Sequence, residues 1–138
     1  MWKIAVVDDE QDNLDVFKFL FRSIEKKNNI QFEKHFILHD ISFCKEDDIL
    51  DIEPDIVFMD IKMAGLSGVE IYDRLRTLGY EKPIIAQTAS VTSFEIEVYQ
   101  EIFTDGILKK PLDEEQIEFF LKKYDLLSEA GNENTRND

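Results

Sequence analysis

The chain of 138 residues is long enough for one domain and too short for two ordinary ones. Its apolar fraction of 43% can supply a core without a disulfide, and the single cysteine, Cys44, fits a reducing compartment. A net charge of −14 argues against nucleic-acid binding and no apolar run approaches the roughly 18 residues of a membrane span, so we expect a cytoplasmic protein contacting neither nucleic acid nor membrane.

The first half of the chain predicts two strands and two helices. Lys3–Val7 is a short apolar run that ends at the acidic triplet Asp8-Asp9-Glu10. Gln31–Leu38 is more polar and predicts an edge strand, and Ser42–Leu50 predicts a weak helix because Asp47-Asp48 interrupts its apolar face. Between the two strands, a longer helix is indicated by an apolar stripe at Leu14, Phe17, Leu20, Phe21 and Ile24.

Two further apolar strands end at polar side chains that can take part in chemistry. Ile56–Met59 stops on Asp60, and a loop with glycines at positions 65 and 68 follows at once. Ile84–Gln87 leads into Thr88. A helical pattern follows each strand, with apolar stripes at Val69, Tyr72, Leu75 and Leu78 and at Ile96, Tyr99, Ile102 and Phe103.

The last strand, Gly106–Lys109, leads into Lys110-Pro111 and a final helix. We expect a domain over residues 1–127 and a disordered polar tail over 128–138. The final helix has an apolar stripe at Ile117, Phe120, Leu121 and Tyr124.

Three helix starts have the spacing of a capping box: Ser67 with Glu70, Thr92 with Glu95, and Asp113 with Gln116.

Strands and helices that alternate five times predict a doubly wound α/β fold, with one parallel sheet of five strands and five helices on its two faces. In such sheets ligands bind beyond the carboxyl ends of the strands. That edge would collect acids from the first and third strands, a hydroxyl from the fourth and an amine from the fifth.

Three carboxylates in a small volume repel one another, and a hard divalent cation relieves this repulsion. Asp8, Asp9 and Asp60 therefore predict a Mg²⁺ site, with the backbone carbonyl of Lys62 as a further ligand. A phosphoryl group held there, with Thr88 and Lys110 as its partners, would make Asp60 the nucleophile of an aspartyl phosphate. Each piece alone has a plainer reading, since adjacent acids before a helix are more often a favourable helix-end charge.

Taken together, four pieces resemble the receiver domain of two-component response regulators, from about Lys3 to Tyr124. They are Val6-Val7-Asp8-Asp9-Glu10, the run from Asp60 to Gly68, Thr88-Ala89 and Lys110-Pro111. The resemblance implies a flavodoxin-like sheet of order 2-1-3-4-5 and transfer of a phosphoryl group to Asp60 from a phosphohistidine of a histidine kinase or phosphotransfer protein. It also implies Mg²⁺ at Asp8 and Asp9, phosphoryl contacts from Thr88 and Lys110, and a cis Lys110–Pro111 bond.

Several positions modulate this expectation. Ala89 fits the family's small side chain beside the site, whereas Ala64 replaces the usual proline. Ile107 stands where the family often has an aromatic switch residue, and an aliphatic side chain cannot reproduce an aromatic swing. Lys62 and Ser90 occupy variable positions that influence phosphoryl hydrolysis in the family.

Two rival functions remain open from the residues. One is a Mg²⁺-dependent phosphatase of the haloacid-dehalogenase type, although its D-x-D motif at the end of the first strand and a cap domain are missing. The other is a flavodoxin-like flavin carrier, which needs a hydroxyl- and glycine-rich loop where this chain has acids. His35 and His39 receive no role, and His39 is expected in a surface loop.

The expected protein is therefore a phosphoacceptor that assists its own phosphorylation rather than an enzyme with conventional turnover. Since no DNA-binding module is recognised after Tyr124, output is expected through a downstream protein partner. Whether it is free-standing or part of a longer regulator or hybrid kinase stays open.

Overall fold

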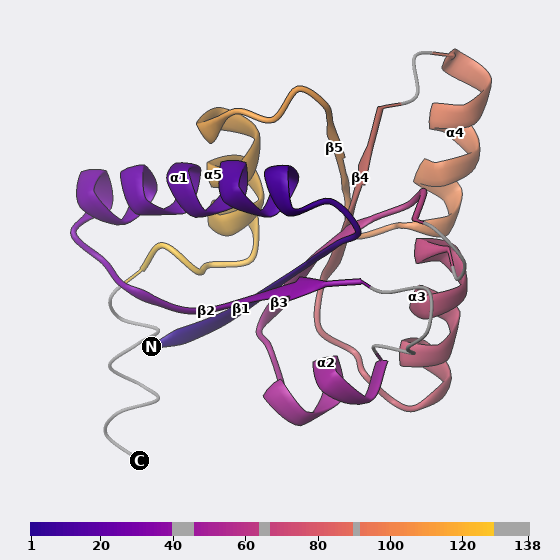
Figure 1. The fold of residues 1–138 in the computed structure, drawn as a ribbon, viewed down its shortest axis with the longest axis horizontal. Coiled ribbons are helices and arrows are strands. Elements are labelled where there is room, and N and C mark those ends of the chain that lie inside the picture. The colour runs from indigo at the N-terminus through magenta and orange to yellow at the C-terminus, as the bar shows by residue number, and fades with distance from the viewer. Residues whose placement is uncertain (40–45, 64–66, 90–91, 129–138) are drawn as a thin grey trace.

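The computed structural model describes residues 1–39, 46–63, 67–89 and 92–128, in which five strands alternate with five helices (Figure 1). All strand pairs are parallel, and their order is β2-β1-β3-β4-β5. The prediction of a doubly wound sheet of this order is confirmed. The bounds are β1 Trp2–Asp8, α1 Gln11–Asn28, β2 Phe32–Leu38, α2 Glu46–Ile52, β3 Ile56–Asp60, α3 Gly68–Thr77, β4 Ile84–Thr88, α4 Ser93–Ile102, β5 Ile107–Lys109 and α5 Glu114–Lys123.

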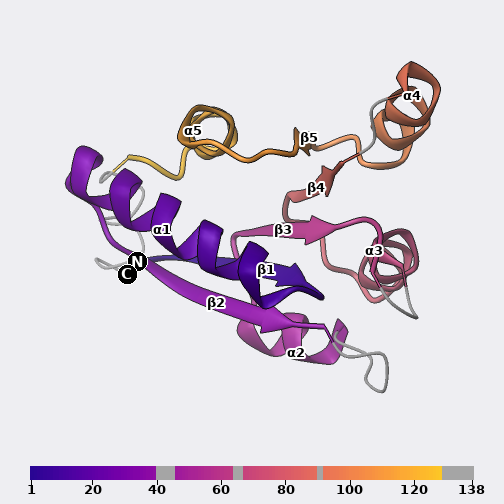
Figure 2. The same ribbon diagram turned by 45° about the horizontal axis from the view of Figure 1, so that its top comes forward.

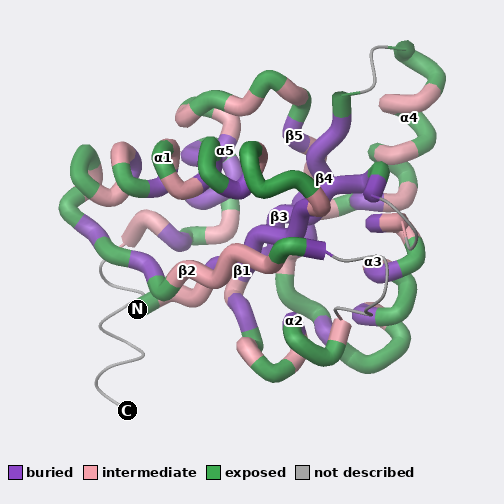
Figure 3. The backbone as a smooth tube through the Cα atoms, viewed as in Figure 1, coloured by how far each residue is buried: buried purple, intermediate pink, exposed green. Residues whose placement is uncertain are grey.

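Helices cover both faces of the sheet (Figures 1 and 2). Helices α1 and α5 pack on one face, where the cluster includes Phe17, Phe21 and Phe58. Helices α2, α3 and α4 pack on the other face, against a cluster that includes Met59 and Ala86. The burial concentrates in the central strands (Figure 3), because a parallel sheet covered on both faces needs apolar side chains on both.

All three expected helix starts have an N-cap hydrogen bond, and one of them forms the complete capping box. Ser67 forms the full capping box, because its hydroxyl accepts from the Glu70 amide and Glu70 reaches back to the Ser67 amide. Thr92 accepts from the Glu95 amide. At α5 the Asp113 carboxylate accepts from the Gln116 amide, while the Gln116 side chain bonds the backbone of Lys109 and Pro111 instead.

The apolar stripe expected on α3 is partly wrong. Ile71 and Leu75 are buried, Val69 and Tyr72 are partly buried, and Leu78 is 57% exposed. The α3 helix ends at Thr77, so Leu78 is its C-cap and no longer follows the helical face. The face that meets the sheet is therefore shifted toward Ile71.

Helix α2 runs over Glu46–Ile52 rather than ending at Leu50, and Ile49 is its buried residue. The part of the expected helix at 42–45, with Cys44, lies outside the described residues, as does nearly all of the expected tail. The Lys110–Pro111 peptide bond is cis, as the resemblance implied.

Candidate functional site

The strand ends place the predicted site residues at one edge of the sheet. Asp8 ends β1, Asp60 ends β3 and Thr88 ends β4, while Lys110 follows β5 directly. The Lys110 amide donates to the Thr88 carbonyl oxygen at 2.9 Å, which ties the end of β5 to the end of β4. The site therefore lies at the carboxyl edge of the central strands, where ligands bind in sheets of this kind.

Asp60 is almost completely enclosed, with 5% of its surface exposed. One carboxylate oxygen, Oδ2, lies 3.5 Å from Nζ of Lys110. Burial is the main reason that the pKa of Asp60 rises to about 6; the charge of Asp8 raises it further, and Lys110 opposes both. A carboxylate held in this way is poorly solvated but still ionised near neutral pH, which suits a nucleophile.

Asp8 is fully buried, and only one of its two carboxylate oxygens accepts hydrogen bonds in the described part of the chain. Its Oδ1 accepts hydrogen bonds from the Glu10 amide at 3.0 Å and from Nδ2 of Asn13 at 3.3 Å. Its Oδ2 has no hydrogen-bond partner among the residues that the structure describes. Burial raises the pKa of Asp8, against the effect of those two hydrogen bonds. A buried carboxylate oxygen left in this state favours an additional cation.

The carboxylates of Asp8, Asp9 and Asp60 offer oxygens that all lie within 4.8 Å of one another. Three oxygens at this separation, one of them an orphaned buried atom, fit a hard cation such as Mg²⁺. Asn13 was missed by sequence reasoning. The available signal was its place five residues after Asp8, where the first turn of α1 folds back over the end of β1.

Gly68 brings the start of α3 against the end of β3. Its amide donates to the Ile61 carbonyl oxygen at 2.8 Å. A Cβ added there would lie 2.2 Å from the backbone oxygen of Asp60 and 2.9 Å from the Ile61 Cα. Only glycine allows this approach, so Gly68 positions the backbone that carries Asp60.

The remaining predicted residues differ in how far they are buried. Thr88 is buried and Ala89 is exposed at the end of β4. Lys62 has an exposed side chain whose Nζ lies 3.4 Å from Oε2 of Glu95 on α4. Ile107 is half-buried and packs against the cluster under α3 and α4. Ala64 and Ser90 lie outside the described residues.

The two histidines lie on or just after β2. The expectation of a surface loop for His39 is wrong, because His39 is 4% exposed and its amide donates to the Asp8 carbonyl oxygen at 2.7 Å. This hydrogen bond holds the backbone of His39 beside the end of β1, one residue past the last pair of the β1–β2 register. His35 instead contacts Oε2 of Glu33 at 2.7 Å.

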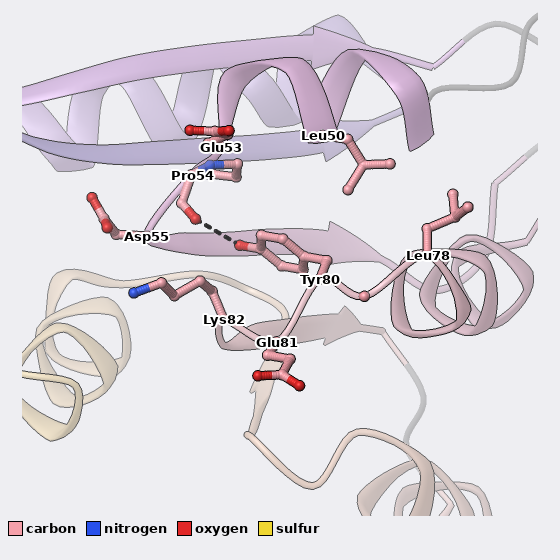
Figure 4. A pocket seen from close by; sticks show the side chains of 9 residues that line it. Leu50, Glu53, Pro54, Asp55, Leu78, Tyr80, Glu81 and Lys82 are labelled. Atoms are coloured by element: carbon pink, nitrogen blue, oxygen red, sulfur yellow. Dashed lines mark hydrogen bonds between the residues drawn. The ribbon is translucent and has the colours of Figure 1, made fainter.

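A separate open hollow of about 520 Å³ lies at the opposite edge of the sheet, beside the starts of β3 and β4 (Figure 4). Its wall includes Tyr80, whose hydroxyl donates to the Pro54 carbonyl oxygen at 2.9 Å. Lys82 lines it as well, together with the carboxylates of Glu53, Asp55 and Glu81. Among the described residues, however, the carboxylates close enough to share a metal ion are those of Asp8, Asp9 and Asp60 at the carboxyl edge.

None of the helices in the described part of the chain combines the length and apolar character needed to cross a bilayer.

Comparisons with known proteins agree with this geometry. Residues 4–122 match the model of the response regulator receiver domain family. The sensory transduction protein LytT of Bacillus cereus is 33% identical over 127 residues, which cover 90% of this chain and 47% of that protein. LytT of Bacillus subtilis is 28% identical over 128 residues, covering 90% of this chain and 48% of that protein. The chain thus spans about half the length of the curated relatives it matches.

Solved structures show the same fold at low identity. The chemotaxis protein CheY4 of Vibrio cholerae is similar with a TM-score of 0.72 and 18% identity, over 90% of this chain and 98% of that one. The signal receiver domain of a DNA-binding response regulator from Colwellia psychrerythraea is similar with a TM-score of 0.74 and 18% identity, over 89% of this chain and 97% of that one.

Proposed function

Because the chain belongs to the response regulator receiver domain family, we propose that it accepts a phosphoryl group on Asp60 from a phosphohistidine of a histidine kinase or phosphotransfer protein. The observation that carries this proposal is the grouping of three carboxylates within 4.8 Å of one another, with Lys110 at 3.5 Å from Asp60. Such a grouping combines a nucleophile with groups that hold the phosphoryl oxygens.

In the proposed reaction, a carboxylate oxygen of Asp60 attacks the phosphorus of the phosphohistidine. A P–O bond forms as the P–N bond to the imidazole breaks, the ring nitrogen keeps the electron pair, and the ring takes a proton from solvent. Asp60 acts without a general base, because its pKa is about 6 and its carboxylate is therefore ionised at neutral pH. The product is an aspartyl phosphate.

Lys110 and Thr88 bind the oxygens of the transferred group. The Lys110 ammonium is already paired with Asp60 and moves only a short distance to a phosphoryl oxygen. Thr88 contributes its hydroxyl from the end of β4, and the small Ala89 leaves room beside it. The domain thereby assists its own phosphorylation by positioning and charge neutralisation.

Mg²⁺ would be held by Asp8, Asp9, Asp60 and the backbone carbonyl of Lys62, and it would supply positive charge that neutralises the phosphoryl oxygens. Asn13 supports this set by fixing Oδ1 of Asp8, so that Oδ2 is left for the ion. The ligand set leaves the Lys62 side chain free to pair with Glu95.

Phosphorylation would act as a switch, because it adds charge and acceptor oxygens at Asp60. Thr88 and Lys110 would shift toward the new oxygens and bias the segments that follow β4 and β5. We propose that Ile107 transmits this change by repacking, while Lys62 and Ser90 influence how long the phosphoryl group persists. Output would then pass through contacts with a downstream protein partner in the cytoplasm.

The phosphatase alternative is not favoured, because the receiver-domain match spans nearly the whole chain.

The test uses acetyl phosphate carrying a ³²P label as the phosphodonor, with Mg²⁺. Wild-type protein is expected to take up label and Asp60→Asn to take up none. The matched control is Asp51→Asn, which makes the same change at an exposed position on α2 and should label like wild type. Full labelling of Asp60→Asn would refute the proposed site.

A further inference from the structure

Gln87 is a buried polar side chain that the proposed function does not use. It precedes Thr88 in β4, and none of its surface is exposed. Neither its Oε1 nor its Nε2 has a hydrogen-bond partner within the described ranges of the chain. An amide buried without partners destabilises a fold by about 1–3 kcal/mol for each unmet group, so a residue of this kind points to a hydrogen bond that forms in another state of the protein.

Strand register places Gln87 directly beside Asp60. Asp60 of β3 pairs with Gln87 of β4, and Gln87 pairs with Leu108 of β5. The β1–β3 register ends at the Val7–Met59 pair, and continuing it by one residue sets Asp8 opposite Asp60. The row across the sheet therefore reads Asp8, Asp60, Gln87, Leu108, on strands about 4.8 Å apart.

These side chains also share one face of the sheet. Val6, Phe58 and Ile85 belong to the cluster under α1 and α5, and each lies two residues before Asp8, Asp60 and Gln87, respectively. Since side chains alternate along a strand, the amide of Gln87 projects from the same face as both carboxylates. Its other neighbour in the row, Leu108, belongs to the same cluster and offers no polar atom.

Asp60 is thus the polar neighbour of Gln87 within the row. Asp60 holds Lys110 through Oδ2. The Gln87 side chain has three rotatable bonds, so its rotation can carry the amide toward a carboxyl oxygen on the adjacent strand.

We propose that Gln87 is a further residue of the phosphoacceptor site. Its Nε2 donates a hydrogen bond to the Asp60 carboxyl oxygen that does not carry the phosphoryl group. This inference rests on the proposed function of Asp60.

The contact has a defined effect on the loss of the phosphoryl group. In hydrolysis, a water oxygen bonds to phosphorus, the P–O bond to Asp60 breaks, and its electron pair returns to the carboxylate. The products are the Asp60 carboxylate and inorganic phosphate, and one proton from the water is released to solvent. A hydrogen bond from Gln87 stabilises the negative charge that develops on the leaving carboxylate, so it shortens the lifetime of the aspartyl phosphate.

The test compares wild type with Gln87→Met, which preserves an unbranched side chain of similar length and removes the donor. Both proteins are labelled with ³²P acetyl phosphate and Mg²⁺, the donor is removed, and loss of label is followed over time. We expect Gln87→Met to lose label about three- to tenfold more slowly than wild type, the effect of losing one hydrogen bond. The control is Ile85→Met, which introduces the same side chain on the same face two residues earlier and should keep the wild-type lifetime.

The free energy of unfolding, measured on the same variants, separates a contact in the site from simple burial. A purely structural misfit predicts that Gln87→Met is more stable than wild type with an unchanged or shortened lifetime, and that result overturns the inference. If wild type labels and Asp60→Asn does not, this outcome leaves the proposed function intact. If wild type takes no label, the proposed function and this inference fail together.

Discussion

At the scale of single residues, the chemistry depends on how Asp60 is charged. Burial and the neighbouring Asp8 raise the pKa of Asp60 to about 6, and the Lys110 ammonium limits that rise. The ionised form of Asp60, which the proposed reaction requires, is therefore the form that the folded protein disfavours. Binding of Mg²⁺ or attachment of the phosphoryl group would each reduce the cost of holding this buried negative charge.

The raised pKa of Asp60 predicts that Asp60→Asn stabilises the metal-free protein at neutral pH. Between pH 4 and pH 6 the folded state binds a proton on Asp60 more tightly than the unfolded state, so the stability of wild type falls as pH rises through that window. The variant lacks this loss, so above pH 6.5 its free energy of unfolding should exceed that of wild type by up to about 3 kcal/mol.

Urea unfolding with a chelator at pH 4.5 and pH 7.5 measures the effect. The difference between the two proteins should be larger at pH 7.5, and a difference that is equal at both values would contradict the assigned shift.

At the scale of secondary-structure elements, the site depends on how closely α3 approaches the end of β3. The capping box at Ser67 fixes where α3 begins, and Gly68 allows its first turn to rest on the backbone of Asp60. The first turn of α3 thereby holds the end of β3 in place.

We predict that Gly68→Ala disturbs both stability and phosphorylation. Its Cβ would meet backbone atoms of Asp60 and Ile61, which cannot move aside without shifting the end of β3. Overpacking of this kind costs about 1–3 kcal/mol, and labelling by acetyl phosphate should slow as Asp60 is displaced.

Gly79→Ala is the control. Gly79 has a φ of +94° and open space around it, so its substitution strains the backbone far from the site. This variant should lose stability and still label at the wild-type rate. If Gly68→Ala also labels at that rate, the close approach has no part in the site.

Much of this arrangement could be predicted from the sequence, because apolar runs that stop on Asp8, Asp60 and Thr88 mark strand ends. The parallel fold then collects those ends at one edge. The face of α3 could not be predicted as well, since Val69, Ile71 and Tyr72 are all apolar and packing alone decides between them.

The supporting residues were harder to find. Asn13 reads as an ordinary first-turn residue until α1 is placed over Asp8. Gln87 reads as part of a strand until the register sets it beside Asp60.

At the scale of the whole molecule, a chain of net charge −14 gathers three carboxylates at the carboxyl edge of its sheet, two of them buried. This grouping opposes folding unless a cation binds there. A cation that binds only the folded state stabilises it by mass action.

We therefore predict that millimolar Mg²⁺ raises the melting temperature of the protein. Asp9→Asn should reduce this response, because it removes one of the three carboxylates, while Asp12→Asn at the exposed start of α1 should retain it. Thermal unfolding with Mg²⁺ and with a chelator measures the difference. An equal response in all three proteins would remove Asp9 from the metal site.

The central claim is that Asp60 carries the phosphoryl group. The most direct measurement treats phosphorylated wild-type protein with borohydride, which reduces an aspartyl phosphate to homoserine, and locates the product by peptide mass spectrometry. The account predicts homoserine at position 60. Homoserine at position 8 or 9 instead, or a stable phosphate on any other residue, would contradict it.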